Sequence, residues 1–208
     1  MELSREIARN LLDIQAVQIR TEDYFTWTSG IKSPIYCDNR LTMSYPDIRA
    51  KIAQAFVQLI EQSEQKPDVI AGCATAGIPH AAWVANRLGL PMVYVRSKPK
   101  GHGKGNQIEG KLEKGQRAIV IEDLISTGGS SIESAKALEK EGITVLGVLA
   151  IFTYGLKKAK EQFLQANLAF RTITDYDELL RLLVEDETIN NEQYRELQSW
   201  RDLLETSH

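Results

Sequence analysis

The chain has 208 residues, 43% of them hydrophobic and 25% charged, which predicts a globular protein with its own core and argues against disorder. Its net charge of −3 argues against general nucleic-acid binding, and no apolar run approaches the roughly 20 residues of a membrane span. The charged N-terminus is unlike a secretory signal, and Cys37 and Cys73 lack metal-ligand spacing. We therefore expect a cytoplasmic protein with reduced thiols and no membrane partner.

The first predicted elements are a helix and an extended segment. Apolar residues at helical spacing predict an amphipathic helix over residues 3–18. Residues 24–40 mix aromatic and β-branched residues with a glycine and Pro34, which predicts a short β-hairpin or hood. Pro46 then marks the start of the next predicted helix, which has one apolar face.

Strands and helices alternate along the rest of the chain. Such alternation implies a mainly parallel, twisted sheet with helices on both faces, and we expect a single α/β domain over residues 1–208. The expected strands cover residues 68–72, 90–95, 118–121, 143–152 and 168–173, and helices at 175–183 and 191–204 are expected to close the chain.

One segment is predicted to be a long loop. Residues 97–115 are rich in glycine and lysine and contain almost no apolar residue. A loop of this length inside a compact domain is uncommon and usually functional. We expect a mobile lid at 96–110, with glycines that allow it to open and close.

The stretch with the clearest chemistry is Arg117–Ser131. The predicted strand 118–121 is followed by the acid pair Glu122 and Asp123 and then by adjacent glycines, before a helix that Ser130 or Ser131 can cap. Ligands of α/β sheets bind beyond the carboxyl ends of strands, and a helix start favours anions. We therefore expect a phosphate cradle with two acids that suit the hydroxyls of a sugar phosphate. The Gly-Lys-Ser/Thr ending of nucleoside triphosphatases and the spaced glycines of dinucleotide folds are both missing.

A basic loop complements this cradle. The segment 96–105 carries four fixed positive charges and one histidine, with no acid among its ten residues. Because the whole chain is acidic, this concentration of charge indicates an anionic partner, such as a pyrophosphate leaving group.

Several motifs resemble one enzyme family. The stretch 117–131 resembles the phosphoribosyl-pyrophosphate motif of type I phosphoribosyltransferases. Arg96, Lys100 and His102 match the mobile loop of orotate phosphoribosyltransferases, and the tail of the loop is similar to the bacterial branch. The segment 25–36 resembles the part of that family that covers the base. The resemblance implies the type I phosphoribosyltransferase fold with a small N-terminal hood at about residues 20–40.

The resemblance also implies a reaction and its components. Orotate would receive the ribose 5-phosphate group of phosphoribosyl pyrophosphate, with Mg²⁺ bound mainly through the pyrophosphate rather than by a metal site of the chain. A homodimer would share the lid between its subunits. The implied catalytic residues are Lys100, His102 and Asp123. The implied substrate-binding residues are Arg96, Lys100, His102, Glu122, Asp123, Leu124, Ile125, Ser126, Thr127, Gly128, Gly129 and Ser130.

The chain departs from the family where relatives carry further basic residues. The positions without the expected cation are Thr28, Ala76, Ser97 and the region of Tyr154. Lys32 is the nearest basic residue to Thr28, and Lys98 directly follows Ser97. Tyr36 stands where the family places an aromatic beside orotate.

Two alternative functions stay open. One is a phosphoribosyltransferase that acts on a purine, although the hood and the Arg-x-x-x-Lys-x-His loop favour orotate. The other is a transcriptional regulator that senses phosphoribosyl pyrophosphate, although about 20 residues before the hood are too few for a winged helix and the chain is acidic.

Overall fold

The centre of the molecule is a six-stranded sheet in the order β10-β9-β8-β5-β6-β7. The computed structural model describes residues 2–26, 30, 32–98 and 107–204. Neighbouring strands are parallel except for the antiparallel pair β6 and β7, which confirms the predicted mainly parallel α/β sheet. The strands are β5 (Val69–Cys73), β6 (Met92–Val95), β7 (Ile108–Glu109), β8 (Arg117–Ile125), β9 (Thr144–Thr153) and β10 (Phe170–Asp175).

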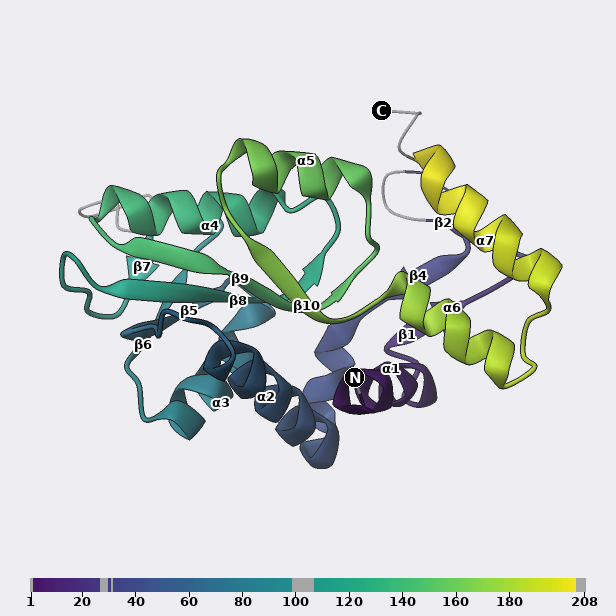
Figure 1. The fold of residues 1–208 in the computed structure, drawn as a ribbon, viewed down its shortest axis with the longest axis horizontal. Helices are drawn as coiled ribbons and strands as arrows, with labels where there is room; N and C mark the ends of the chain where they lie inside the picture. The colour runs from purple at the N-terminus through teal and green to yellow at the C-terminus, as the bar shows by residue number, and fades with distance from the viewer. Residues whose placement is uncertain (1, 27–29, 31, 99–106, 205–208) are drawn as a thin grey trace.

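Helices cover both faces of this sheet, as Figure 1 shows. Helices α2 (Pro46–Glu61) and α3 (Gly77–Leu88) lie on one face, and α4 (Gly129–Lys140) and α5 (Lys157–Gln165) lie on the other. Alternate residues of β8 enter separate cores: Ile119 packs with the first pair of helices and Val120 with the second. Because side chains alternate along a strand and both faces are buried, the strand reads as a continuous apolar run.

The two ends of the chain meet in the hood region. The antiparallel pairs are β1 (Val17–Ile19) with β4 (Ile35–Cys37) and β2 (Phe25–Thr26) with β3 (Lys32–Ser33), which confirms a hairpin in the predicted segment. Figure 1 shows α7 beside β2, and the indole Nε1 of Trp200 donates to the carbonyl of Lys32 at 3.1 Å. The other elements of this region are α1 (Glu2–Asp13), the 3₁₀ helix η1 (Asn39–Ser44), α6 (Tyr176–Glu185) and α7 (Asn191–Leu204).

The structure corrects three local predictions. The first helix ends at Asp13 instead of residue 18, because Gln15 has a positive φ of 56° and the chain then enters β1. Strand β8 continues to Ile125, so the acid pair lies inside the strand and not after it. Helix α4 starts after Gly128, whose φ is 87°, and no side chain caps it, so the predicted serine cap is wrong.

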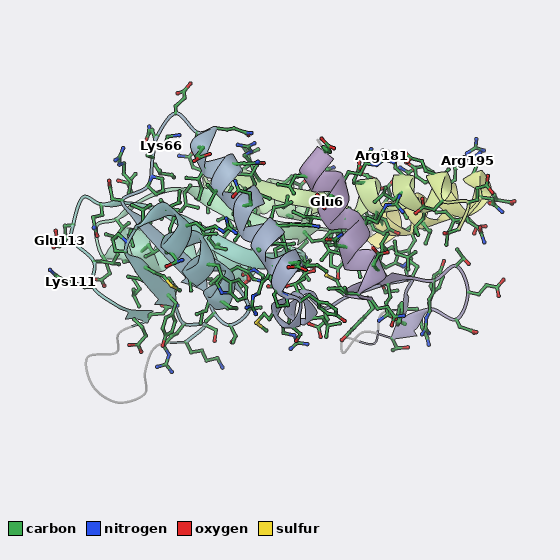
Figure 2. All side chains as sticks on the ribbon, turned by 90° about the horizontal axis from the view of Figure 1, so that it is seen from below. Glu6, Lys66, Lys111, Glu113, Arg181 and Arg195 are labelled. Carbon is green, nitrogen blue, oxygen red and sulfur yellow. The ribbon has the colours of Figure 1, made fainter. Side chains whose placement is uncertain are left out.

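Charged side chains of both signs lie at both ends of the molecule. Figure 2 shows Lys111 and Glu113 at one end and Arg181 and Arg195 at the other. Lys111 pairs with Glu113 at 3.0 Å, and Arg181 pairs with Glu178 at 2.7 Å.

Among the described residues, no helix is long and apolar enough to cross a membrane.

Candidate active site

The strand order creates a switch point between β5 and β8. From β5 the chain moves to β6 on one side, and it later returns to β8 on the other side of β5. Ligands of open α/β sheets bind at such a point, outside the carboxyl ends of the strands. A Cβ atom at Gly77, which opens α3, would lie 2.3 Å from the carbonyl oxygen of Ile121. Only glycine therefore allows α3 to lie so close to β8.

The turn from β8 into α4, residues 126–128, is held from both sides. A side chain at Gly128 would meet Phe163 of α5 at 2.5 Å, so glycine is required by packing as well as by the positive φ. The hydroxyl of Thr153, at the end of β9, donates to the carbonyl of Ile125 at 2.8 Å. Since the first N–H groups of a helix lack partners within the helix, this fixed turn presents donors to an anion.

Glu122 lies beneath this turn and is only 5% exposed. Its Oε1 accepts from the main-chain N–H of Asp123 at 3.0 Å, and its Oε2 accepts from the hydroxyls of Ser130 at 3.3 Å and Ser131 at 3.4 Å. Burial, followed by the interactions with Asp123, raises the pKa of the Glu122 carboxyl above its usual range. The cause is that burial disfavours the charged form and that the neighbouring carboxylate repels a second negative charge.

Asp123 is half-buried and is held from the side of the hood. The Nδ2 of Asn39, at the start of η1, donates to the main-chain carbonyl of Asp123 at 2.8 Å. Asn39 is 1% exposed, and its Oδ1 is buried without a hydrogen-bond partner. The hood therefore fixes the backbone of Asp123 while its carboxylate stays partly accessible.

Two tyrosines lie on the side of Asp123 that faces the hood. Tyr36, on β4, is 41% exposed, and its ring lies 5.7 Å from that of Phe25. Tyr154, which follows β9, is buried and stands edge-on to Phe152 at 5.6 Å. Burial first, and then the nearby Cys37, Asp123 and Tyr36, raise the pKa of the Tyr154 phenol. The hood and the end of β9 thus contribute aromatic surface on the side of Asp123.

The predicted loop 97–115 is not wholly without regular structure, because β7 lies inside it and forms a short β-ladder with β6. The N–H of Arg96 donates to the carbonyl of Gln107 at 2.8 Å, and the side chain of Gln107 donates back to the carbonyl of Arg96 at 2.9 Å. The guanidinium of Arg96 lies 3.4 Å from the carboxylate of Glu109. The ladder holds Arg96 and Gln107 together at the edge of the sheet.

The predicted site residues divide into two groups. Those from Glu122 to Ser130 lie together at the carboxyl end of β8 and the start of α4. Arg96 lies at the base of the lid, whereas Lys100, His102 and Thr28 lie outside the described residues. Ser97, Lys98 and Lys32 are exposed, and Ala76 is half-buried before α3.

The described residues contain no cluster of three or more histidine, cysteine or acidic side chains that could hold a metal ion. Asp123 offers a partly exposed carboxylate, and Glu122 a buried one. Such oxygen donors suit a hard cation whose other ligands are mostly water molecules and phosphate oxygens.

Sequence reasoning missed several residues that support the acid pair. Asn39 reaches Asp123 from 84 positions away. Cys73, which the sequence suggested only as a reduced thiol, accepts from the hydroxyl of Ser134 at 3.2 Å beside Glu122. The sequence offered one signal of these contacts. Ser131 and Ser134 stand among the apolar residues of α4, and a buried serine needs a hydrogen-bond partner.

Comparison with known proteins decides the family. The family model described as "Phosphoribosyl transferase domain" matches residues 43–175. A relative from Oceanobacillus iheyensis, named orotate phosphoribosyltransferase, is 61% identical over 202 residues, which cover 97% of this chain and 100% of the relative. A Bacillus subtilis relative of the same name is 54% identical over 199 residues, which cover 96% of this chain and 92% of the relative.

The chain belongs to the orotate phosphoribosyltransferase family. It is therefore a phosphoribosyltransferase, an enzyme that transfers a pentosyl group. The solved orotate phosphoribosyltransferase of Aeropyrum pernix is 29% identical and superimposes with a TM-score of 0.75, covering 85% of this chain and 97% of that chain. The sheet and the turns described above are thus the type I phosphoribosyltransferase fold expected from the sequence.

Proposed function

We propose that the chain transfers the ribose 5-phosphate group of phosphoribosyl pyrophosphate to orotate, which gives orotidine 5′-phosphate and pyrophosphate. This is a step of pyrimidine biosynthesis that leads to UMP. The observation that carries the proposal is the acid pair beside a glycine-rich helix start at the switch point, in a chain of the orotate phosphoribosyltransferase family.

The turn after β8 anchors the 5′-phosphate. The main-chain N–H groups at the start of α4 donate to the phosphate oxygens, and the helix dipole favours the negative charge. Leu124 and Ile125 lead the backbone into this turn, and the contacts come from Ser126, Thr127, Gly128, Gly129 and Ser130.

The acid pair binds the sugar. Glu122 and Asp123 accept hydrogen bonds from the ribose hydroxyls. Asp123 also favours the positive charge that develops on the sugar as the bond to pyrophosphate breaks, because a fixed negative charge is most effective where charge appears in the transition state. The half-buried position of Asp123 supports this role.

The basic loop supplies charge to the leaving group. Arg96, Lys100 and His102 bind the pyrophosphate oxygens, where each contact strengthens as negative charge develops. His102 acts by hydrogen bonding or by proton transfer to the leaving group. Closure of the loop excludes water, which would otherwise hydrolyse the activated sugar.

Mg²⁺ fits this site as an ion carried by the substrate. When bound, it supplies positive charge to the pyrophosphate. Asp123 is the half-buried carboxylate that suits such an ion, directly or through water.

We further propose a cytoplasmic homodimer in which each lid completes the site of the neighbouring subunit. The resemblance of the segment 96–110 to the mobile loop of that family, which reaches across a dimer interface, supports this assembly.

The decisive experiment is to incubate the chain with orotate, phosphoribosyl pyrophosphate and Mg²⁺ and to follow the absorbance of orotate. Loss of that absorbance with the appearance of pyrophosphate is expected. A panel with adenine, hypoxanthine and xanthine tests the purine alternative, and a nucleic-acid shift assay tests the regulator. Turnover of a purine but not of orotate would overturn the proposal.

A further inference from the structure

A buried polar cluster lies behind the acid pair. Beside Glu122, its members are Ser131 (0% exposed), Ser134 (4%) and Cys73 (2%). They come from three elements: Cys73 ends β5, Glu122 lies in β8, and the serines lie in α4. The surrounding side chains, such as Ile132 and Ala135, are apolar.

The contacts of this cluster converge on one carboxyl group. Ser131 donates to Oε2 of Glu122 at 3.4 Å, and the thiol of Cys73 lies beside the same carboxyl group. Ser134 donates to the sulfur of Cys73 at 3.2 Å. A buried carboxylate needs such donors, because the cost of its desolvation is otherwise uncompensated.

Stability alone does not explain a polar cluster at this place. Replacement of a buried ionic or polar group by apolar side chains of similar volume is often neutral or stabilising. The cluster also connects the two turns at the switch point. Cys73 directly precedes the turn 74–76, and Ser131 lies in the first turn of α4, directly after the turn 126–128.

We propose that Ser131, Ser134 and Cys73 are positioning residues, which fix the carboxyl group of Glu122 against the start of α4 and so set its orientation toward the ribose hydroxyls. This inference rests on the proposed role of Glu122 as a ribose ligand. Ser130 also contacts Glu122, at 3.3 Å, but it is exposed and is itself a proposed phosphate ligand, so it is not a positioning residue.

The test is a double-mutant cycle with steady-state kinetics. Ser131→Ala is expected to lower kcat/KM for phosphoribosyl pyrophosphate by about 10-fold or more, since a hydrogen bond to a charged group is lost. In the Glu122→Gln background, the same substitution is expected to change kcat/KM by less than about 2-fold, because residues that act through one another are not additive.

A conservative variant and a matched control separate positioning from general damage. Cys73→Ser keeps a donor and is expected to retain activity, whereas Cys73→Ala is expected to lose it. Thr174→Val removes another buried hydroxyl, on β10, which is 3% exposed and outside the cluster, and should leave kcat/KM unchanged. Thermal unfolding of each variant is recorded beside its kinetics.

The pH profile gives a second readout. Hydrogen bonds to the charged form stabilise it, so loss of the Ser131 donor should move the acid limb of kcat/KM to higher pH. The other titratable groups that face Glu122 are Asp123 and Cys73, and neither is altered in this variant.

The outcomes distinguish two kinds of failure. Full activity of Glu122→Gln would remove the proposed ribose role and the inference with it. If Glu122→Gln is impaired but Ser131→Ala lowers kcat/KM equally in both backgrounds, or has no effect, the positioning role is overturned while the proposed function stands. A loss in Cys73→Ser as large as that in Cys73→Ala would also overturn it.

Discussion

Glu122 and Asp123 are neighbours in the sequence but occupy opposite environments. Strand geometry points successive side chains to opposite faces, so Glu122 enters the core under α4 and Asp123 faces the hood. One acid is therefore surrounded by serines and a thiol, and the other keeps a half-buried carboxylate beside the aromatic hood. The division of roles within the pair follows from this alternation.

Lys100 is predicted to act mainly in the transition state. Lys100→Ala should lower kcat by at least about 100-fold and change the binding of phosphoribosyl pyrophosphate much less, because the cation is needed most when charge develops on the leaving group. Steady-state kinetics and calorimetric binding measure the two effects, and Lys98→Ala serves as the control in the same loop. Near-normal turnover of Lys100→Ala would contradict a catalytic lid.

His80 is predicted to make the folded protein sensitive to acid. It is 1% exposed, its Nδ1 has no hydrogen-bond partner, and its ring stands edge-on to Trp83 at 5.2 Å. Burial lowers the pKa of His80 from 6.5 to about 4. The unfolded state therefore binds the proton more tightly, and stability is lost as the pH falls from 6.5 toward 4.

Comparison with His80→Leu isolates this contribution. Between pH 7 and pH 5, the free energy of unfolding of the wild type should fall by about 2 kcal/mol more than that of the variant. Urea denaturation at the two pH values measures the difference. The raised pKa of Glu122 has the opposite effect, but it is present in both proteins and cancels. Equal pH dependence of the two proteins would mean that His80 titrates normally.

At the scale of elements, the site depends on how closely α3 and α4 pack against the sheet. Strand β8 continues past its apolar run because Leu124 and Ile125 pair with Phe152 and Thr153 of β9. This pairing places the acid pair in a fixed register at the carboxyl end of β8. The turn 126–128 then begins where the strand pairing ends.

Gly77→Ala is predicted to disrupt this packing. The added methyl group would lie 2.3 Å from the carbonyl oxygen of Ile121, so α3 must move away from β8. We expect a loss of about 3 kcal/mol or more in the free energy of unfolding, measured with urea. Gly129→Ala is the control, because its added methyl group would meet no atom within 4 Å and its φ is not positive. That variant should stay within about 1 kcal/mol of the wild type, and equal stability of both variants would refute the close-approach explanation.

At the scale of the whole molecule, both ends of the chain meet beside the hood. Arg9 of α1 pairs with Asp186 at 2.6 Å, and Trp200 of α7 donates to the hairpin at 3.1 Å. The C-terminal helix also brings a cation near the end of β9, since a Cβ at Gly155 would lie 3.8 Å from Nη1 of Arg201. Segments that flank the family domain, which covers residues 43–175, therefore pack beside the hood.

Sharing of the lid between subunits predicts complementation. Lys100→Ala and Asp123→Asn should each be nearly inactive alone. When the two are unfolded together and refolded, hybrid dimers should recover about a quarter of the wild-type activity, because half of the dimers then hold one intact site. Orotate consumption measures the recovery, and mixing without refolding is the control. Absence of any recovery in dimers that do form would argue against shared sites.

The sequence by itself determined the alternation of strands and helices, the glycine-containing turn 126–128 and the acid pair, because apolar periodicity, glycine conformation and the order of motif residues are local properties. It misplaced the end of the first helix and of β8, since pairing with β4 and β9 decides those ends. Only the tertiary structure decided which acid is buried, and which residues support the pair. Asn39, Cys73 and Ser134 reach the acids from other elements, and such contacts depend on packing between segments that are far apart in the chain.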